Sequence, residues 1–212
     1  DPYHGSLLHL FHSTFGLYRA TQKGFTYMDP SNRHTLLKAT ASAAPTSASE
    51  DQEVYKDVRS YNTAFHLKDA SVLEGRLEFD DRASLVINAI FPNLLIQEIA
   101  NCLAVRQSVT HAPNAFEIVW TLFGYADDDE EMQMIRMKQS NLVGPAGLIS
   151  MEDGEAVEIV QDAVVRDGKK TSVLAMGGVR SGSVDHMITE GPIIGFWENY
   201  ARYLNLGTDV KK

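Results

Sequence analysis

Three consecutive segments rich in β-branched and aromatic residues constrain the fold of this chain more than any other feature. They follow one another closely and are separated by short turn sequences, of which His111-Ala112-Pro113-Asn114 is the clearest. Val, Ile, Phe and Trp favour strands, and strands joined by short turns pair antiparallel. The pattern therefore predicts an antiparallel meander. The three segments cover residues 84–91, 94–109 and 114–126.

Helical sequence is expected on both sides of these strands along the chain. Strands grouped between helices, rather than alternating with them, indicate an α+β fold, and we expect one domain over residues 1–212. The sequence contains no internal repeat. The remaining segments are predicted as a helix over 4–18, a strand over 33–40, a surface loop over 41–53, a fragmented helical region over 54–78, and helices over 132–142, 150–165 and 189–206.

The charge balance excludes some classes of partner. Among 212 residues, 19 Lys and Arg stand against 28 Asp and Glu, which gives a formal net charge of −9. An acidic surface repels phosphate backbones and anionic lipids, so neither nucleic acid nor a membrane surface is an expected partner. The sequence has no apolar run near the roughly 18 residues of a membrane span, and we expect a cytoplasmic protein.

The single cysteine, Cys102, excludes an internal disulfide and an iron–sulfur cluster held by this chain alone. Cys102 lies in a predicted strand and is expected in the core. The chain begins at Asp1 with neither Met nor a signal peptide, and we expect it to be a piece of a longer polypeptide.

Three of the seven histidines, His4, His9 and His12, lie close together near the start of the chain. Positions five apart on an ideal helix are separated by roughly 140° of rotation. His4 and His9 could therefore share one metal only where the backbone departs from a regular helix. Spacing alone is equally compatible with ordinary core or surface histidines.

Asp153 has two possible roles. The segment Ser150-Met151-Glu152-Asp153 fits a capping box with Ser150 as the helix N-cap. A carboxylate in the first turn of a helix, just after the glycine-containing segment 144–147, could instead point into a cleft. Two imidazoles and one carboxylate with open positions form the ligand set of mononuclear non-haem Fe(II) oxygenases.

Two segments resemble one known family in the same order along the chain. Residues Asp1-Pro2-Tyr3-His4-Gly5-Ser6-Leu7-Leu8-His9 resemble the D-x-Y-H-x-x-x-x-H segment of Rieske-type aromatic-ring-hydroxylating oxygenase large (alpha) subunits. Residues 141–155 are similar to the segment of that family that supplies the third iron ligand. The resemblance continues through residues 123–128 and 188–190, and it spans essentially the whole chain.

The resemblance implies a helix-grip (START-like) catalytic domain, with a curved antiparallel sheet and flanking helices. It implies that His4, His9 and Asp153 bind a mononuclear Fe(II). It also implies that Asp1 carries electrons from the Rieske cluster of a neighbouring subunit, within a homotrimer or an α₃β₃ assembly with a small β subunit. A ferredoxin and a reductase would supply those electrons, and O₂ would be the co-substrate.

One feature departs from the family pattern. The family's Rieske domain binds a [2Fe–2S] cluster through a Cys-x-His and a Cys-x-x-His pair, whereas this chain has one cysteine. We therefore expect the Rieske domain to be absent from residues 1–212 and the cluster to be bound elsewhere in the full-length subunit. The strands that precede the Asp1 segment in the family are also missing, so the domain is expected to be incomplete at its N-terminus.

The resemblance is strongest with the branch that acts on aromatic acids such as salicylate, anthranilate, terephthalate and benzoate. A carboxylate in an apolar pocket needs a cationic partner, and a guanidinium can bind it in a bidentate manner. Arg106 is the candidate, although strand alternation equally allows it to face solvent, and Arg180 is a second choice. An apolar slot for the ring is expected from Val143, Leu148 and Ile149, which could also be core residues.

Met187 stands near the position at which dicarboxylate enzymes of the family carry a second basic residue, so the resemblance favours a monocarboxylate. The predicted function is therefore iron-dependent hydroxylation of an aromatic carboxylic acid. A hypothesis from another class is a non-catalytic helix-grip module that binds a hydrophobic ligand or serves assembly.

Overall fold

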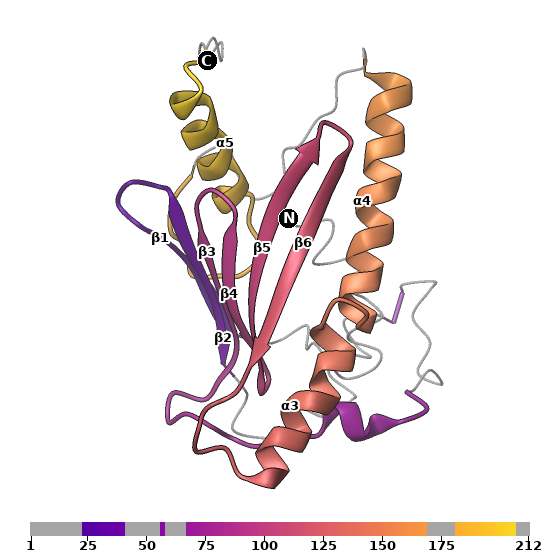
Figure 1. Cartoon of the computed structure of the whole chain (residues 1–212). Helices are drawn as coiled ribbons and strands as arrows, with labels where there is room; N and C mark the ends of the chain where they lie inside the picture. The colour runs from indigo at the N-terminus through magenta and orange to yellow at the C-terminus, as the bar shows by residue number, and fades with distance from the viewer. Residues whose placement is uncertain (1–22, 41–55, 58–66, 169–180, 207–212) are drawn as a thin grey trace.

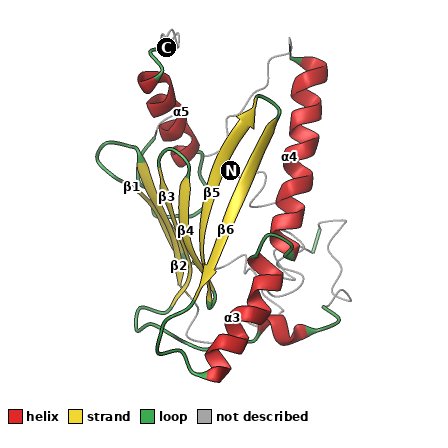
Figure 2. Cartoon of the chain, viewed as in Figure 1, coloured by secondary structure: helices red, strands yellow, loops and turns green. Residues whose placement is uncertain are grey.

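The computed structural model describes residues 23–40, 56–57, 67–168 and 181–206, and the statements below concern these residues. Six strands form one antiparallel sheet in which each strand pairs with its neighbour in sequence (Figures 1 and 2). The predicted α+β class and the antiparallel meander are confirmed. The strands are β1 (Gly24–Met28), β2 (His34–Thr40), β3 (Ala83–Ile90), β4 (Leu94–Ile99), β5 (Cys102–Ala112) and β6 (Ala115–Phe123).

The strand boundaries differ from the sequence-based prediction in two places. The segment 94–109 is two strands rather than one, because the chain turns at Ala100-Asn101, where Ala100 has a φ of 52°. A left-handed alanine is uncommon, and neither glycine nor proline signals this turn. The second difference is β1, which pairs with β2 and was not predicted.

Three α-helices and one short 3-10 helix complete the described structure. The helices predicted over 132–142, 150–165 and 189–206 are confirmed within a few residues, and Pro192 lies in the first turn of the last one. The helix predicted over 4–18 and the loop predicted over 41–53 lie outside the described residues. The prediction of a fragmented helical region over 54–78 is wrong for residues 74–78, which follow the 3-10 helix without helical structure. The elements are η2 (Ala70–Leu73), α3 (Glu130–Val143), α4 (Leu148–Asp167) and α5 (Gly191–Tyr203).

The helices pack on one face of the sheet, here called the inner face. Residues directly opposite each other in an antiparallel pair point to the same side, so the register places Met28, Gln97, Cys102 and Arg106 on this face. The Met28 side chain lies against Gly195 of α5. Cys102 forms a core cluster with the C-terminal end of α3, which confirms the expected core position of this cysteine.

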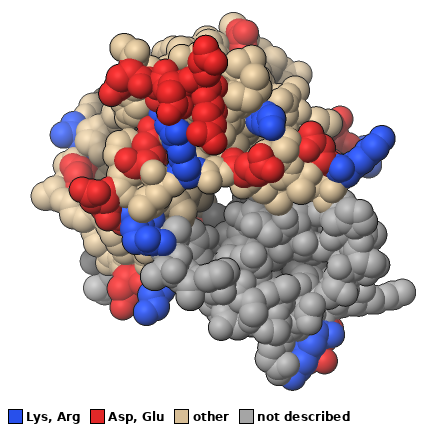
Figure 3. Space-filling model, turned by 90° about the horizontal axis from the view of Figure 1, so that it is seen from below, with Lys and Arg blue, Asp and Glu red and all other residues tan. Residues whose placement is uncertain are grey.

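A buried ion-pair network fixes the start of α3. The guanidinium of Arg136 is 7% exposed, pairs with Glu78 and Asp128, and donates to the main-chain oxygen of Asn101 at 2.6 Å. The carboxylate of Asp129 caps the helix by accepting from the main-chain nitrogen of Met132 at 2.7 Å. The acidic residues here are therefore paired and capping groups, not simply solvated ones. Figure 3 shows the molecule from below, where acidic side chains lie close to basic ones.

A tight glycine-containing connection joins α3 to α4. A Cβ at Gly144 would overlap the main-chain oxygen of Ser140, and a Cβ at Gly147 would overlap the main-chain carbonyl of Leu142. Only glycine fits such a close approach of two backbones. The connection therefore sets where α4 starts relative to the end of α3.

Within the described residues, no helix combines the length and apolarity needed to cross a membrane.

Candidate functional site

A cleft of about 740 Å³ lies between α4 and the inner face of β5 and β6. Aromatic and aliphatic side chains form much of its wall, and charged residues line it on both sides. The aliphatic and aromatic lining includes Phe116, Ile118, Trp120 and Val157, and the charged groups include Arg106 from β5 and Asp153 from α4. A mostly apolar cleft with a few convergent polar groups is typical of a small-molecule site.

Arg106 occupies the sheet side of the cleft. It lies directly opposite Trp120 in the β5–β6 pair, and its Cζ is 5.0 Å from the centroid of the Trp120 ring. The Nε of Arg106 is buried and has no hydrogen-bond partner within the described part of the chain. Burial lowers the pKa of Arg106, and the charge of Asp153 partly opposes this shift. The guanidinium is therefore a desolvated cation with donor capacity available to a ligand.

Asp153 reaches the cleft from the second turn of α4. The N-cap of this helix is Gly147, without a side-chain cap, so the prediction of Ser150 as the N-cap is wrong. Ile149 packs against the core cluster of Cys102, Leu142 and Val143. Because residues four apart share a helix face, this packing directs Asp153 towards the sheet one turn further along.

The other sequence-based candidates fall into three groups. Val143 is a buried member of the core cluster, Ile149 packs against that cluster, and Leu148 is 47% exposed at the start of α4. None of these three lines the cleft, among the residues described there. Met187 lies beside Gly24 of β1. Asp1, His4, His9 and Arg180 lie outside the described residues, so their predicted roles remain predictions.

The described part of the chain contains one of the three predicted iron ligands. No group of three or more His, Cys, Asp or Glu residues suited to a metal occurs within the described ranges. Asp153 lines the cleft from a helix that is anchored in the core, and this position is compatible with a metal ligand. Sequence reasoning missed Trp120, although strand alternation places it on the same side as Arg106 once the hairpin register is known.

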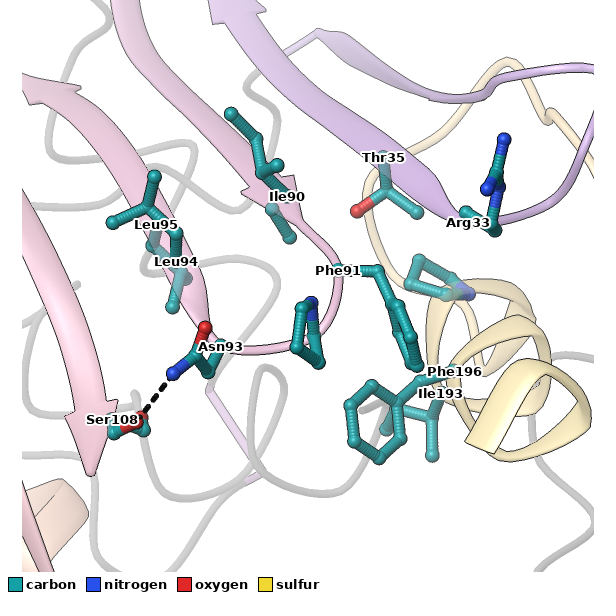
Figure 4. A pocket seen from close by; sticks show the side chains of 13 residues that line it. Arg33, Thr35, Ile90, Phe91, Asn93, Leu94, Leu95, Ser108, Ile193 and Phe196 are labelled. Carbon is teal, nitrogen blue, oxygen red and sulfur yellow. Dashed lines mark hydrogen bonds between the residues drawn. The ribbon is translucent and has the colours of Figure 1, made fainter. Parts of the chain in front are cut away.

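A second, smaller pocket of about 270 Å³ lies between α5 and the turn that joins β3 to β4 (Figure 4). Phe91 from the turn and Phe196 from α5 face each other with ring centroids 5.5 Å apart. The side-chain nitrogen of Asn93 donates to the main-chain oxygen of Ser108 at 2.9 Å, which closes one end. Arg33 lies at the rim and is held by the Tyr203 hydroxyl at 3.0 Å. The contact between Phe91 and Phe196 indicates that the residues around this pocket pack α5 against the sheet.

The fold is that of a known oxygenase. The crystal structure of naphthalene 1,2-dioxygenase from Rhodococcus sp. bound to indole superimposes with a TM-score of 0.63 at 13% sequence identity, over 98% of this chain and 52% of that one. At this identity the likeness concerns the fold alone. No protein-family model matches the chain.

By sequence, the chain is a relative of the large subunits of aromatic ring-hydroxylating oxygenases. It is 43% identical over 205 residues to the anthranilate 1,2-dioxygenase large subunit of Burkholderia cepacia, covering 96% of this chain and 48% of that protein. It is 42% identical over 206 residues to the terephthalate 1,2-dioxygenase terminal oxygenase component subunit alpha 2 of Comamonas sp., covering 96% and 49%. The large oxygenase component of salicylate 5-hydroxylase from Ralstonia sp. is 35% identical over 205 residues, covering 96% and 48%. The chain thus spans about half the length of the curated relatives it matches.

Proposed function

We propose that the chain is the iron-binding catalytic part of an oxygenase that hydroxylates an aromatic carboxylic acid with O₂. One observation carries this proposal: a desolvated arginine, Arg106, faces an apolar cleft across from an acidic residue, Asp153. Three relatives are named for anthranilate, terephthalate and salicylate. All three compounds are aromatic acids, which supports the same substrate class here.

Arg106 would bind the substrate carboxylate. Its Nε is without a hydrogen-bond partner in the structure, so the guanidinium can offer parallel N–H groups to both carboxylate oxygens. The indole of Trp120 lies against one side of the guanidinium and restricts its orientation. The apolar walls of the cleft would then exclude water from the ring, which strengthens the charge-assisted hydrogen bonds.

His4, His9 and Asp153 would hold a mononuclear Fe(II), the ion that supplies O₂ activation when it is bound. Asp153 would supply the one negative charge among these ligands, and the two neutral histidines leave the ion a net positive charge. Asp1 would carry electrons from the Rieske [2Fe–2S] cluster of a neighbouring subunit. The helix that bears Asp153 would be held in position by residues at the end of α3 and the start of α4, namely Val143, Leu148 and Ile149.

The partners follow from the same proposal. The functional assembly would be a homotrimer or an α₃β₃ complex with a small β subunit, supplied with electrons by a ferredoxin and a reductase. A monocarboxylate such as salicylate, anthranilate or benzoate is favoured over a dicarboxylate, because Arg106 is the one basic residue among the described residues that line the cleft. Neither nucleic acid nor a membrane is a proposed partner.

Ligand titration tests the role of Arg106. We expect the chain to bind salicylate more tightly than phenol, and Arg106→Met to remove most of this preference. Breaking a charge-assisted hydrogen bond of this kind corresponds to about 10-fold or more in affinity. Arg202→Met, at an exposed position of α5, removes the same charge away from the cleft and should leave both affinities unchanged. Equal affinities for salicylate and phenol in the unmodified chain would remove the proposed role.

Metal analysis tests the iron site separately. After anaerobic loading with Fe(II), we expect about one iron per chain. His4→Ala and Asp153→Asn should each lose the ion, while Glu158→Gln, also on α4 along the cleft, should retain it. If the chain binds the aromatic ligand without iron, and none of the three substitutions changes that binding, the result would instead favour the non-catalytic module.

A further inference from the structure

Gln97 in β4 is a buried amide without hydrogen-bond partners. Its side chain is 2% exposed, and neither its Nε2 nor its Oε1 has a hydrogen-bond partner among the residues that the structure describes. An amide has two donors and a carbonyl acceptor, and leaving such a group unpaired in the interior is unfavourable because its hydration is lost without replacement. Buried polar side chains are nearly always satisfied, so an exception of this kind points to a ligand or an ordered water.

The sheet register places Gln97 beside Arg106. Gln97 lies directly opposite Ala104 of β5, and Arg106 is two residues further along the same strand. All three side chains therefore point to the inner face. Diagonal neighbours of this kind are about 7–8 Å apart at Cα, within the reach of long side chains. Ala104 is fully buried and too small to shield or pair with the amide.

The helix above the sheet brings Asp153 to the same level. Ile149 packs over the core cluster that contains Cys102 and borders Ile99. One turn of α4 advances by about 5.4 Å, and two residues of a strand advance by nearly 7 Å. Asp153, one turn beyond Ile149, is thus level with the part of the sheet that runs from Ala104 to Arg106. Gln97 faces the same side of the sheet as Arg106, beside the residues that line the cleft rather than among them.

We infer that Gln97 determines substrate specificity by hydrogen bonding the group ortho to the carboxylate that Arg106 binds. This inference rests on the proposed function and narrows its substrate class to benzoates with an ortho hydroxyl or amino group. The Gln97 carbonyl accepts from the hydroxyl or amino hydrogen. Its amide nitrogen donates to the oxygen of an ortho hydroxyl.

The chemistry of the amide accounts for selectivity as well as binding. A site that hydrogen-bonds a substrate hydroxyl strongly rejects the analogue without it, because the buried polar groups of the site are then left unpaired. Benzoate would leave both polar atoms of Gln97 in that state. Salicylate would satisfy both atoms and anthranilate the carbonyl, since each carries an ortho group with at least one donor.

Matched titrations test the inference with salicylate, anthranilate and benzoate as probes. We expect the unmodified chain to prefer salicylate and anthranilate over benzoate. Gln97→Leu, which is similar in volume and apolar, should weaken salicylate and anthranilate binding about tenfold and leave benzoate binding unchanged. Gln107→Leu is the control, because Gln107 is exposed on the opposite face of β5 and should change none of the three.

The outcomes separate this inference from the proposed function. Gln97→Leu removes an unpaired amide, so we expect its urea midpoint to be equal to or above that of the unmodified chain. Gln97→Met replaces it in the titrations if Gln97→Leu fails to fold. An equal loss for all three ligands, or no loss for any, would show that Gln97 holds a water or only fills the core. If Arg106→Met still abolishes carboxylate preference in that case, the proposed function stands and only the role of Gln97 is lost.

Discussion

The guanidinium of Arg106 lies over the indole ring of Trp120, 5.0 Å from the ring centroid, and the two residues face each other across β5 and β6. Both line the cleft, so this contact is part of the candidate site. A cation against an aromatic face gains about 0.5–2 kcal/mol, more when it is desolvated. The Nε of Arg106 is buried, and this burial lowers the pKa of Arg106.

Replacing Trp120 should loosen Arg106 without removing its charge. We expect Trp120→Leu to weaken salicylate binding about fivefold, as the loss of roughly 1 kcal/mol implies, and to leave phenol binding nearly unchanged. Trp120→Phe retains an aromatic face and should recover most of the affinity. Isothermal titration of the three proteins measures this directly. Val119→Ala, on the opposite face of β6, should match the unmodified chain, and an equal loss for salicylate and phenol in Trp120→Leu would indicate a general packing defect instead.

Substitutions at two glycines of the α4 region should have opposite effects. Gly147→Ala would place a Cβ against the main-chain carbonyl of Leu142, so we expect a loss of about 1–3 kcal/mol in the free energy of unfolding. Gly154→Ala lies within α4 with open space around it, and it should stabilise the chain by about 0.5–1 kcal/mol. Urea denaturation measures both. A neutral Gly147→Ala would mean that the connection from α3 to α4 relaxes freely.

The Arg136 network should contribute far more to stability than an exposed ion pair. We expect Arg136→Met to lower the free energy of unfolding by about 3–5 kcal/mol, because it leaves Glu78 and Asp128 buried without their cation. Arg166→Ala breaks the exposed pair with Asp162 and should change stability by less than about 0.5 kcal/mol. Chemical denaturation at neutral pH compares the two, and similar small losses would contradict the importance of the buried network.

The same network predicts a dependence on acid. The hydrogen bond from Arg136 lowers the pKa of Asp128 from its ordinary value of 3.8. A carboxyl with a lower pKa in the folded state stabilises the fold above its unfolded pKa, and this stability is lost as the pH falls through the folded pKa. The stability gap between the unmodified chain and Asp128→Asn should therefore be full at pH 7 and shrink below about pH 4. Urea midpoints across that range measure it, and a constant gap would contradict the coupling.

The thiol of Cys102 should be unreactive in the folded chain. Burial raises its pKa to about 11, so at pH 8 the thiolate is scarce as well as inaccessible. We expect an aromatic disulfide reagent to label Cys102 slowly at pH 8 and rapidly once urea unfolds the chain. Rapid labelling without urea would mean that the core cluster at the end of α3 opens readily.

The sheet was largely predictable from sequence because β-branched runs and turn residues are local signals. The hairpin at His111-Ala112-Pro113-Asn114 and the strand at His34–Thr40 are confirmed. The turn at Ala100-Asn101 was not predictable, since it uses a left-handed alanine in place of glycine. The strand Gly24–Met28 is short and depends on its pairing with β2, a tertiary contact that local propensity does not report.

The candidate site was predictable as a set of residue types but not as an arrangement. Arg106 and Asp153 were singled out separately, and their convergence on one cleft depends on the packing of α4 against the sheet. The sequence indicated Ser150 as the N-cap, because a serine followed by an acid resembles a capping box. The helix starts earlier, since the close backbone approach at Gly147 determines its beginning. Gln97 gave no signal in the sequence, because an unpaired buried amide is recognisable only from its surroundings.

The meander order of the sheet has a kinetic consequence. Every strand pairs with the strand next to it in the chain, and apart from the β2–β3 pair, which joins His34–Thr40 to Ala83–Ile90, these pairs are hairpins of short sequence separation, which favours rapid folding. The bridge between Thr26 and Val184, and the contact between Met28 and Gly195, join distant parts of the chain instead. Closing such long loops is entropically unfavourable, so docking of α5 onto β1 should follow sheet formation. In unfolding experiments, this docked end of the molecule is where separation should begin.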